Sequence, residues 1–195
     1  TKRRDENYDW IYYFISNGTI TRGYLNLPDK FISTTVTMSD TTVTLTGSQP
    51  GSGTAGGTYV AYCWAESPTQ SFGEYTGNGT KITVDCGFEP AFVLLKGSDI
   101  DTNWFMYDNV RNPNNPRENT LAANLSSVEG SADLPVGYLP IEFTSTGFTY
   151  TGSNANANGD GNTYIYAAFA SGGGGPSGVV GDITGLDVTL SESTG

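Results

Sequence analysis

Residues 57–65 read GTYVAYCWA, and residues 162–170 read NTYIYAAFA. In both stretches a short polar start leads through Thr and Tyr into an apolar run, so that Tyr59 in the first corresponds to Tyr164 in the second. Short runs rich in Val, Ile, Tyr and Phe predict β-strands. The recurrence of one strand pattern at two places in the chain predicts a fold built from repeated β-modules.

Other segments recur in the same order. Each copy has an aromatic stretch, YDWIYYF or TNWFMYD, with Trp10 and Trp104 at the same place. A connector with an Asn-Leu pair, a Thr-rich stretch and the apolar strand then follow in both copies. The corresponding segments are 8–14 and 102–108, 24–27 and 121–125, 37–47 and 142–152, and 57–65 and 162–170.

The two copies differ in extent. Before Trp104 lie three further strand patterns, FGEYTGN, KITVDC and AFVLLK, and no such pattern precedes Trp10. We therefore expect residues 1–66 to be the rear part of a first β-repeat, truncated at its front, and residues 70–170 to be a complete second β-repeat. The front strands absent before Trp10 then leave an open sheet edge unless another part of the chain, or another subunit, covers it.

Two segments follow the second repeat. Residues 171–178 (SGGGGPSG) have the composition of a Gly-rich linker. Residues 179–195 contain DITGLDVTL, and we expect them to start a further β-module. Inside the second repeat, residues 119–129 (NTLAANLSSVE) form the one stretch that could make a short helix.

The hydrophobic pattern has a period of two in several segments. In KITVDC, residues 81–86, Ile82, Val84 and Cys86 fall on one face and Lys81, Thr83 and Asp85 on the other. Residues 91–96, apart from Lys96, and residues 164–169 are apolar, which predicts central strands. Together these patterns predict an all-β chain of tandem antiparallel β-sandwich, jelly-roll-like modules.

Composition narrows the possible functions. The 9 Lys and Arg residues against 20 Asp and Glu residues give a formal net charge of −11, and the acidic residues are scattered. A nucleic-acid partner is not expected, because no basic face is visible and the cluster of Lys2, Arg3 and Arg4 is predicted to be an exposed end. The sequence has no His, which removes the commonest general base and metal ligand. It also lacks an apolar run of about 18 residues, so no membrane insertion is expected.

No catalytic, metal-binding or cofactor-binding residue is predicted. Four glutamates are possible acids, but the sequence gives no reason to pair any two of them. Cys63 and Cys86 are predicted to be reduced thiols, although a disulfide between them stays possible. These glutamates are Glu89, Glu118, Glu129 and Glu142.

Two groups of oxygen-bearing side chains and two tryptophans remain as candidates for binding. The oxygen-rich groups, one around the strand of Trp104 and one in a loop, could hold calcium. A turn role is the alternative for the loop. Trp10 and Trp104 could serve as sugar-stacking platforms, with a packing role as the alternative. The oxygen-rich groups are Asp99, Asp101 and Asp108, and Asn154, Asn156, Asn158 and Asp160.

The order FGEYTGNGT, CGFEPAFVLLK, NWFMYDNVR, TSTGFTY and NTYIYAAFA resembles a tandem β-domain family found in phage tail-fibre and related virion proteins. The resemblance covers residues 70–170 as one copy and residues 8–66 as the rear of a preceding copy. It implies a virion location in a tail or another surface appendage. Its implied partners are other copies of the chain, as a homotrimer in a fibre, other virion proteins, and a glycan or protein on the host surface.

Three functions follow as hypotheses. The first is a non-catalytic structural and host-attachment module of a phage tail fibre or similar virion appendage. The second is a carbohydrate-binding module or adhesin domain on a cell surface. The third is a polysaccharide depolymerase, whose carboxylates would have to come from distant strands.

Overall fold

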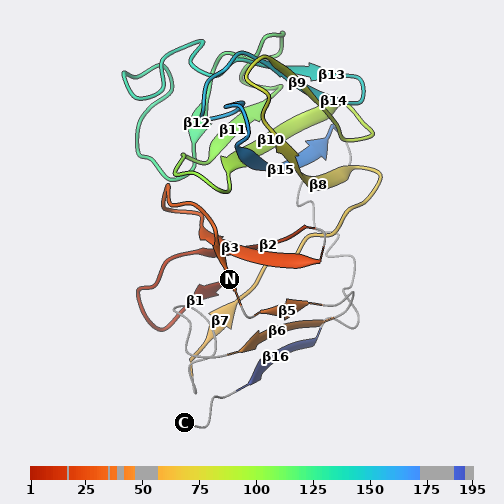
Figure 1. The fold of residues 1–195 in the computed structure, drawn as a ribbon. Coiled ribbons are helices and arrows are strands. Elements are labelled where there is room, and N and C mark those ends of the chain that lie inside the picture. The colour runs from red at the N-terminus through yellow and green to blue at the C-terminus, as the bar shows by residue number, and fades with distance from the viewer. Residues whose placement is uncertain (17, 35, 39–41, 47–56, 172–186, 192–195) are drawn as a thin grey trace. The chain divides into compact units, whose positions relative to one another are not determined.

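The computed structural model describes residues 1–16, 18–34, 36–38, 42–46, 57–171 and 187–191 (Figure 1). All of the secondary structure in this part of the chain is β-strand, which confirms the predicted all-β class. The chain divides into two compact units. The first unit comprises Thr1–Leu27, Phe31–Trp64 and Val179–Gly195, and the second comprises Pro28–Lys30 and Ala65–Gly178.

The second unit contains a five-stranded antiparallel sheet in the order β12-β11-β10-β15-β8. The strands that carry the two long apolar runs, β10 and β15, lie side by side inside this sheet, as the sequence predicted. Each is therefore hydrogen-bonded on both edges. The strands span β8 Gln70–Thr76, β10 Pro90–Gly97, β11 Phe105–Asp108, β12 Leu121–Ala122 and β15 Thr163–Ala170.

A three-stranded sheet in the order β13-β14-β9 forms the other layer of this unit. It consists of β13 (Ile141–Thr144), β14 (Gly147–Thr151) and β9 (Lys81–Asp85). In β9, Val84 is buried while Lys81 and Thr83 are exposed, which confirms the predicted alternation. The first residue of β14 is a glycine, because a Cβ at position 147 would lie 1.9 Å from the Val84 carbonyl oxygen.

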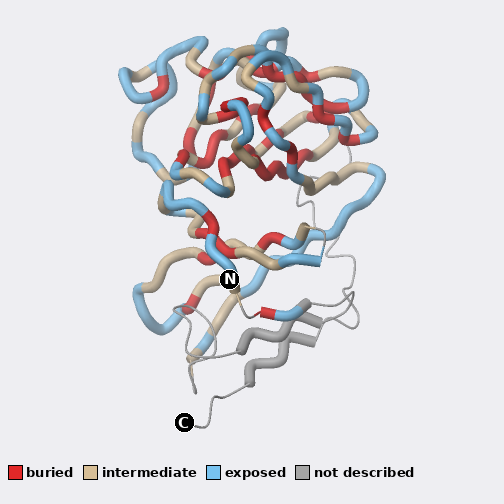
Figure 2. Tube along the Cα trace, viewed as in Figure 1, coloured by how far each residue is buried: buried red, intermediate tan, exposed pale blue. Residues whose placement is uncertain are grey.

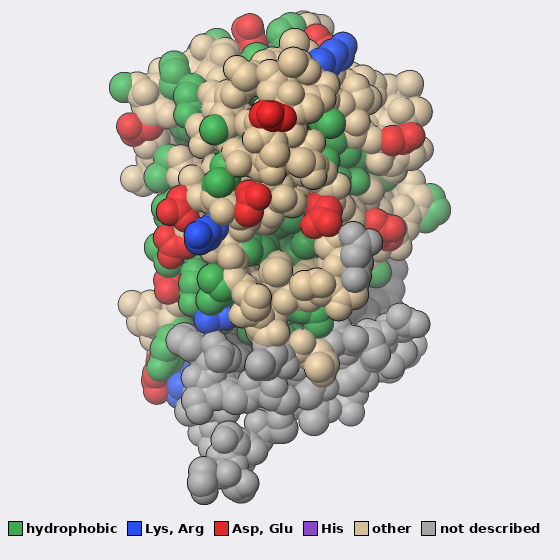
Figure 3. Space-filling view, in the orientation of Figure 1, with side chains coloured by type: hydrophobic (Ala, Val, Ile, Leu, Met, Phe, Trp, Pro, Cys, Tyr) green, Lys and Arg blue, Asp and Glu red, His purple; other side chains and the backbone are tan. Residues whose placement is uncertain are grey.

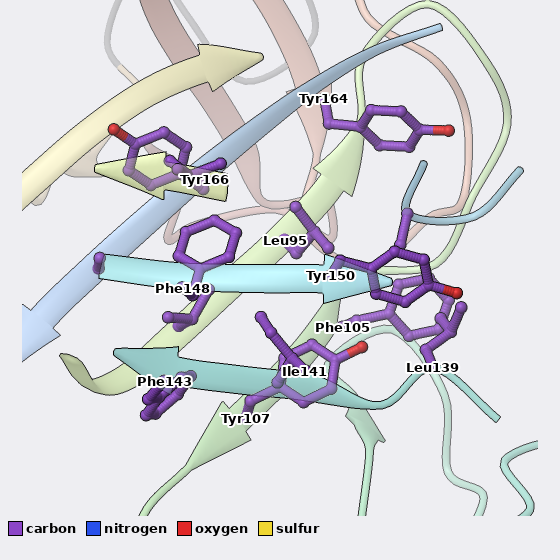
Figure 4. Close-up of a cluster of buried hydrophobic side chains, with 14 of the residues drawn as sticks. Leu95, Phe105, Tyr107, Leu139, Ile141, Phe143, Phe148, Tyr150, Tyr164 and Tyr166 are labelled. Carbon is purple, nitrogen blue, oxygen red and sulfur yellow. The ribbon is translucent and has the colours of Figure 1, made fainter. Parts of the chain in front are cut away.

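The core of the second unit lies between these two sheets (Figure 2). Phe148 of β14 meets Tyr166 of β15 edge-on, with ring centroids 5.4 Å apart, and Tyr75 of β8 stacks on Tyr164 at 5.2 Å. Figure 4 shows Phe148, Tyr164 and Tyr166 together with Leu95 and other buried side chains of this core. A fully buried side chain of this size contributes about 1.5–3 kcal/mol, so the aromatic residues supply much of the stability of this unit.

In the described residues, the first unit has three small sheets. The largest hairpin joins β2 (Ile11–Ser16) to β3 (Thr19–Tyr24), with β4 (Ile32–Ser33) on the far edge. Strand β1 (Lys2–Arg3) pairs with β7 (Tyr59–Val60). The third sheet has the order β16-β6-β5, with β5 at Thr37–Met38, β6 at Thr42–Thr46 and β16 at Asp187–Ser191.

Several expectations from the sequence are corrected. Residues 119–129 form no helix, because Leu121 and Ala122 pair with β11 as an edge strand. The described part of residues 179–195 is β16, which pairs in parallel with β6 of the first unit instead of opening a separate module. Arg3 of the basic cluster is buried, because it lies in β1 and is ion-paired. Of the predicted linker 171–178, only Ser171 lies within the described residues.

The same hydrogen bonds recur around the two tryptophans. The Trp10 amide donates to Oδ1 of Asn26 at 3.0 Å, and the Trp104 amide donates to Oδ1 of Asn124 at 2.9 Å. Each Asn also donates through Nδ2 to the residue before the tryptophan, Asp9 at 2.6 Å or Asn103 at 2.8 Å. In both units the tryptophan carbonyl accepts from the residue before the Asn at 2.9 Å. The predicted equivalence of Trp10 and Trp104 therefore extends to the connector.

The equivalence also reaches the first residues of the chain. The Arg4 amide donates to the Thr58 carbonyl at 2.8 Å, and the Ser98 amide donates to the Thr163 carbonyl at 2.9 Å. The amides of these threonines in turn donate to a carboxylate of the preceding turn, Asp5 or Asp99. Strand β1 therefore corresponds to the last part of β10, which corrects the expectation that no strand precedes Trp10.

Candidate binding surface

The two predicted sugar platforms lie in different environments. Trp104 is 1% exposed, so its ring is not open to a sugar ligand. Trp10 is half-buried, so part of this residue is exposed to solvent on the first unit. The repeat places both residues at one position of the strand pattern, so their different burial comes from the side chains around them.

Trp10 belongs to a row of three aromatic side chains, with Tyr62 and Trp64, which we call the aromatic row. Tyr62 stacks on Trp10 with ring centroids 6.2 Å apart and an interplanar angle of 30°. Trp64 continues the row at 6.2 Å from Tyr62. Tyr62 is 60% exposed and Trp64 is 52% exposed, so their rings offer apolar surface to the solvent.

Sequence reasoning placed Tyr62 and Trp64 in an apolar strand and missed their exposure. Strand β7 ends at Val60, and residues 61–68 are all exposed. The spacing of two between Tyr62 and Trp64 is the signal for a shared face of an extended chain. The counterpart of Trp64 in the second unit is Phe169, which packs at 5.7 Å from Phe72 and 6.0 Å from Phe92.

A shallow depression adjoins the aromatic row. It is lined by residues 2–7 together with Trp10 and Val60. The buried guanidinium of Arg3 makes ion pairs with Asp5 at 2.8 Å and Glu6 at 2.9 Å. The hydrogen bond from Arg3 lowers the pKa of Asp5 to about 2, so the pair stays ionised at neutral pH. The positive charge of Arg3 is therefore balanced locally by these two carboxylates.

The predicted calcium candidates are not brought together. Asp99 accepts from the Thr163 amide, Asp101 accepts from the Lys30 amide at 2.9 Å, and Asp108 pairs with Arg111. In the described part of the chain no cluster of three or more potential metal ligands occurs.

The Asn-rich loop at residues 154–160 has a structural role. Asn158 is fully buried and donates through Nδ2 to the Gly152 carbonyl at 2.8 Å. Its Oδ1 accepts from the Asn78 amide at 2.8 Å. These bonds tie the loop to the β8–β9 turn, in agreement with the turn alternative.

Several titratable groups among the described residues are ion-paired or buried. Of the four glutamates considered, Glu129 is paired with Arg111. Lys96 is fully buried, donates to the Pro28 carbonyl at 2.8 Å, and has its pKa lowered to about 8 by burial. Both cysteines are free, with Cys63 exposed and Cys86 buried, and burial raises the pKa of Cys86 to about 12.

The face drawn in Figure 3 shows how charged side chains are distributed over the described residues. On the face shown in Figure 3, Asp and Glu side chains are spread among neutral residues, with Lys and Arg side chains fewer. Within the part of the chain that the structure describes, there is no helix long and apolar enough to cross a membrane. The aromatic row is therefore the candidate binding surface of the described residues.

The fold defines an all-β protein in which one hydrogen-bonded frame occurs twice. The chain belongs to the DUF7483 family, a domain of unknown function, whose family model matches residues 1–172. This match runs through both of the predicted repeats in one stretch. Neither the curated proteins nor the solved structures contain a match to the chain.

Proposed function

We propose that the chain is a non-catalytic structural and host-attachment module of a phage tail fibre or a similar virion appendage. The observation that carries this proposal is the repeated hydrogen-bond pattern around Trp10 and Trp104, in which an asparagine side chain accepts from the tryptophan amide in both units. Repeated β-units of this kind suit an elongated appendage, because each unit adds length without a new fold.

The rest of the proposal concerns partners. In such an appendage the module would associate with other copies of itself, as a homotrimer, and with other virion proteins. Its loops and the aromatic row would provide the contact with a glycan or a protein on the host surface, because loops held by a rigid β-scaffold are common binding sites. The resemblance of its sequence segments to tail-fibre domains supports this assignment.

Immunogold labelling of purified virions tests the location. An antibody raised against the chain should label the tail or another appendage, and a pre-immune serum should not. Protein detected in the virion but confined to the capsid interior, or no labelling of any particle, would contradict the proposal.

The aromatic row supports a second candidate, a carbohydrate-binding module. Exposed aromatic rings stack on the apolar faces of sugar rings, and Tyr62 and Trp64 lie 6.2 Å apart in such an exposed arrangement. On a glycan array, saturable binding that Trp64→Ala reduces at least tenfold would favour this function. Ile15→Ala is the matched control, since Ile15 is also exposed, at 47%, and lies outside the row.

A further inference from the structure

Strand β9, Lys81–Asp85, is the last strand of the β13-β14-β9 sheet in the second unit. It lies in the middle of the chain, between β8 and β10 of the same unit. Among the described residues, no strand pairs with the side of β9 that faces away from β14. We call this side the β9 edge. An unpaired edge of this kind is where a sheet can accept a further strand.

The hydrogen bonds at the two ends of β9 show which of its backbone groups face this edge. The Cys86 amide donates to the Thr146 carbonyl at 2.7 Å, and the Gly152 amide donates to the Thr80 carbonyl at 2.6 Å. Both bonds continue the β9–β14 register, in which bonded pairs alternate with non-bonded pairs. The even-numbered residues of β9 therefore bond to β14. The amides and carbonyls of its odd-numbered residues, 81, 83 and 85, face the β9 edge.

The odd-numbered residues also carry the exposed side chains of β9, a cation, a hydroxyl and an anion in that order: Lys81, Thr83 and Asp85. None of the ion pairs among the described residues includes Lys81 or Asp85. These two side chains are too far apart to pair with each other, because four residues of an extended strand span about 13 Å. Oδ1 of Asp85 accepts from the Gly87 amide at 2.9 Å, so this carboxylate is already held in place on the strand.

The order of these residues is complementary to itself. When two copies of residues 81–85 (KITVD) lie antiparallel with Thr83 opposite Thr83, Lys81 of each copy lies opposite Asp85 of the other. The outward amide and carbonyl of Thr83 then form the central bonded pair, and Ile82 lies opposite Val84 on the core side. A parallel arrangement would place Lys81 beside Lys81, and a shift by two residues would place each charge opposite an uncharged residue. The charge pattern therefore selects one orientation and one register.

We propose that the β9 edge is the docking site for a second copy of this chain, paired antiparallel through β9 about a two-fold axis at Thr83. Such an isologous contact joins the three-stranded sheets of two copies into one continuous sheet, and the Lys81–Asp85 ion pair forms twice. A contact through one short strand is small, so we expect a weak dimer that depends on protein concentration. The inference goes beyond the proposed function and is independent of it, since a homotrimer in a fibre would have to use other surfaces.

Hydrogen exchange on the unsubstituted chain at increasing concentration tests the geometry. The amides of Thr83 and Asp85 face the β9 edge, so their exchange should slow at least tenfold as the dimer forms. The amides of Ile82 and Val84 are bonded to β14 in monomer and dimer alike, so their exchange should change much less. Sedimentation velocity on the same samples should show the conversion of monomer to dimer.

Charge reversal tests the register. Lys81→Asp places two carboxylates opposite each other at both ends of the paired strands, and Asp85→Lys places two ammonium groups there. Each variant alone should stay monomeric, whereas an equal mixture of the two should dimerise, because every charge then meets its opposite. The chain that carries both substitutions is again complementary to itself and should also dimerise. Glu142→Lys is the matched control and should dimerise as the unsubstituted chain does, since Glu142 is exposed on β13 at the other side of the sheet.

Four results would overturn the proposal. The first is an unsubstituted chain that stays monomeric up to its limit of solubility. The second is an oligomer in which the Thr83 amide exchanges as fast as in the monomer, which would place the contact on another surface. The third is an oligomer that the single charge reversals leave intact. The fourth is a doubly reversed chain that stays monomeric although its far-UV circular dichroism and urea unfolding match those of the unsubstituted chain.

Discussion

The two asparagines that clasp Trp10 and Trp104 make the same bonds in different surroundings, and their removal should have unequal costs. In Asn124→Ala, the amide of the buried Trp104 loses its acceptor, and the bond to Asn103 is lost as well. An orphaned buried donor costs about 1–3 kcal/mol and a lost net hydrogen bond about 1 kcal/mol. We therefore expect Asn124→Ala to destabilise the second unit by about 2–4 kcal/mol.

In Asn26→Ala the same two bonds are lost, but Asn26 is exposed and water can take its place. The expected cost is below about 1 kcal/mol. Asn124→Asp keeps the acceptor for the Trp104 amide and should fall between the two alanine variants.

Urea unfolding followed by far-UV circular dichroism measures these costs, and native-state hydrogen exchange assigns them to a unit. A loss of 2 kcal/mol in the second unit speeds exchange through global opening of that unit about thirtyfold, since 1.4 kcal/mol is a factor of ten. Exchange at the Trp104 amide should follow this change in Asn124→Ala, with the core of the first unit unaffected. Equal costs for Asn26→Ala and Asn124→Ala, or a cost below about 0.5 kcal/mol for Asn124→Ala, would contradict the assigned difference in burial.

Three further predictions concern single residues. Gly147→Ala should destabilise the second unit by more than about 2 kcal/mol in urea unfolding, because its Cβ would lie 1.9 Å from the Val84 carbonyl oxygen; a neutral result would contradict the β9–β14 geometry. Burial lowers the pKa of Lys96 to about 8, so between pH 8 and its ordinary value near 10.5 the unfolded chain binds more protons and stability should rise with pH. Lys96→Met should remove that rise, and parallel pH profiles of the free energy of unfolding for the two proteins would argue against it. A thiol reagent should modify the exposed Cys63 within minutes and the buried Cys86 only on unfolding, and equal rates in mass spectrometry would contradict their assigned burial.

The parts of the fold that followed from the sequence are those fixed by local pattern. The continuous apolar runs predicted the paired strands β10 and β15, and the alternation in KITVDC predicted the buried face of β9. The repeat identified Trp10 and Trp104 as equivalent, and the structure extends this to Asn26 and Asn124.

What the sequence did not predict depends on partners distant along the chain. Leu121 and Ala122 form an edge strand because Met106 and Phe105 offer backbone groups to them, and a helical pattern carries no information about that edge. The exposure of Tyr62 and Trp64 likewise depends on which distant side chains lie over them. An apolar run has the same hydrophobic pattern whether its side chains are covered or exposed. The aromatic row could therefore not be recognised from its own residues.

The division of the chain into units has a consequence for dissecting the protein. Pro28–Lys30 belongs to the second unit, although the residues on both sides of it belong to the first. The Pro28 carbonyl accepts both from Nζ of the buried Lys96 and from the Thr102 amide. A gene fragment that starts at Ala65 would leave an ammonium group and an amide in the interior without this acceptor. The gene sequence of the second unit is therefore interrupted by that of the first. Recombination that exchanges the second unit as an intact segment would also have to transfer residues 28–30.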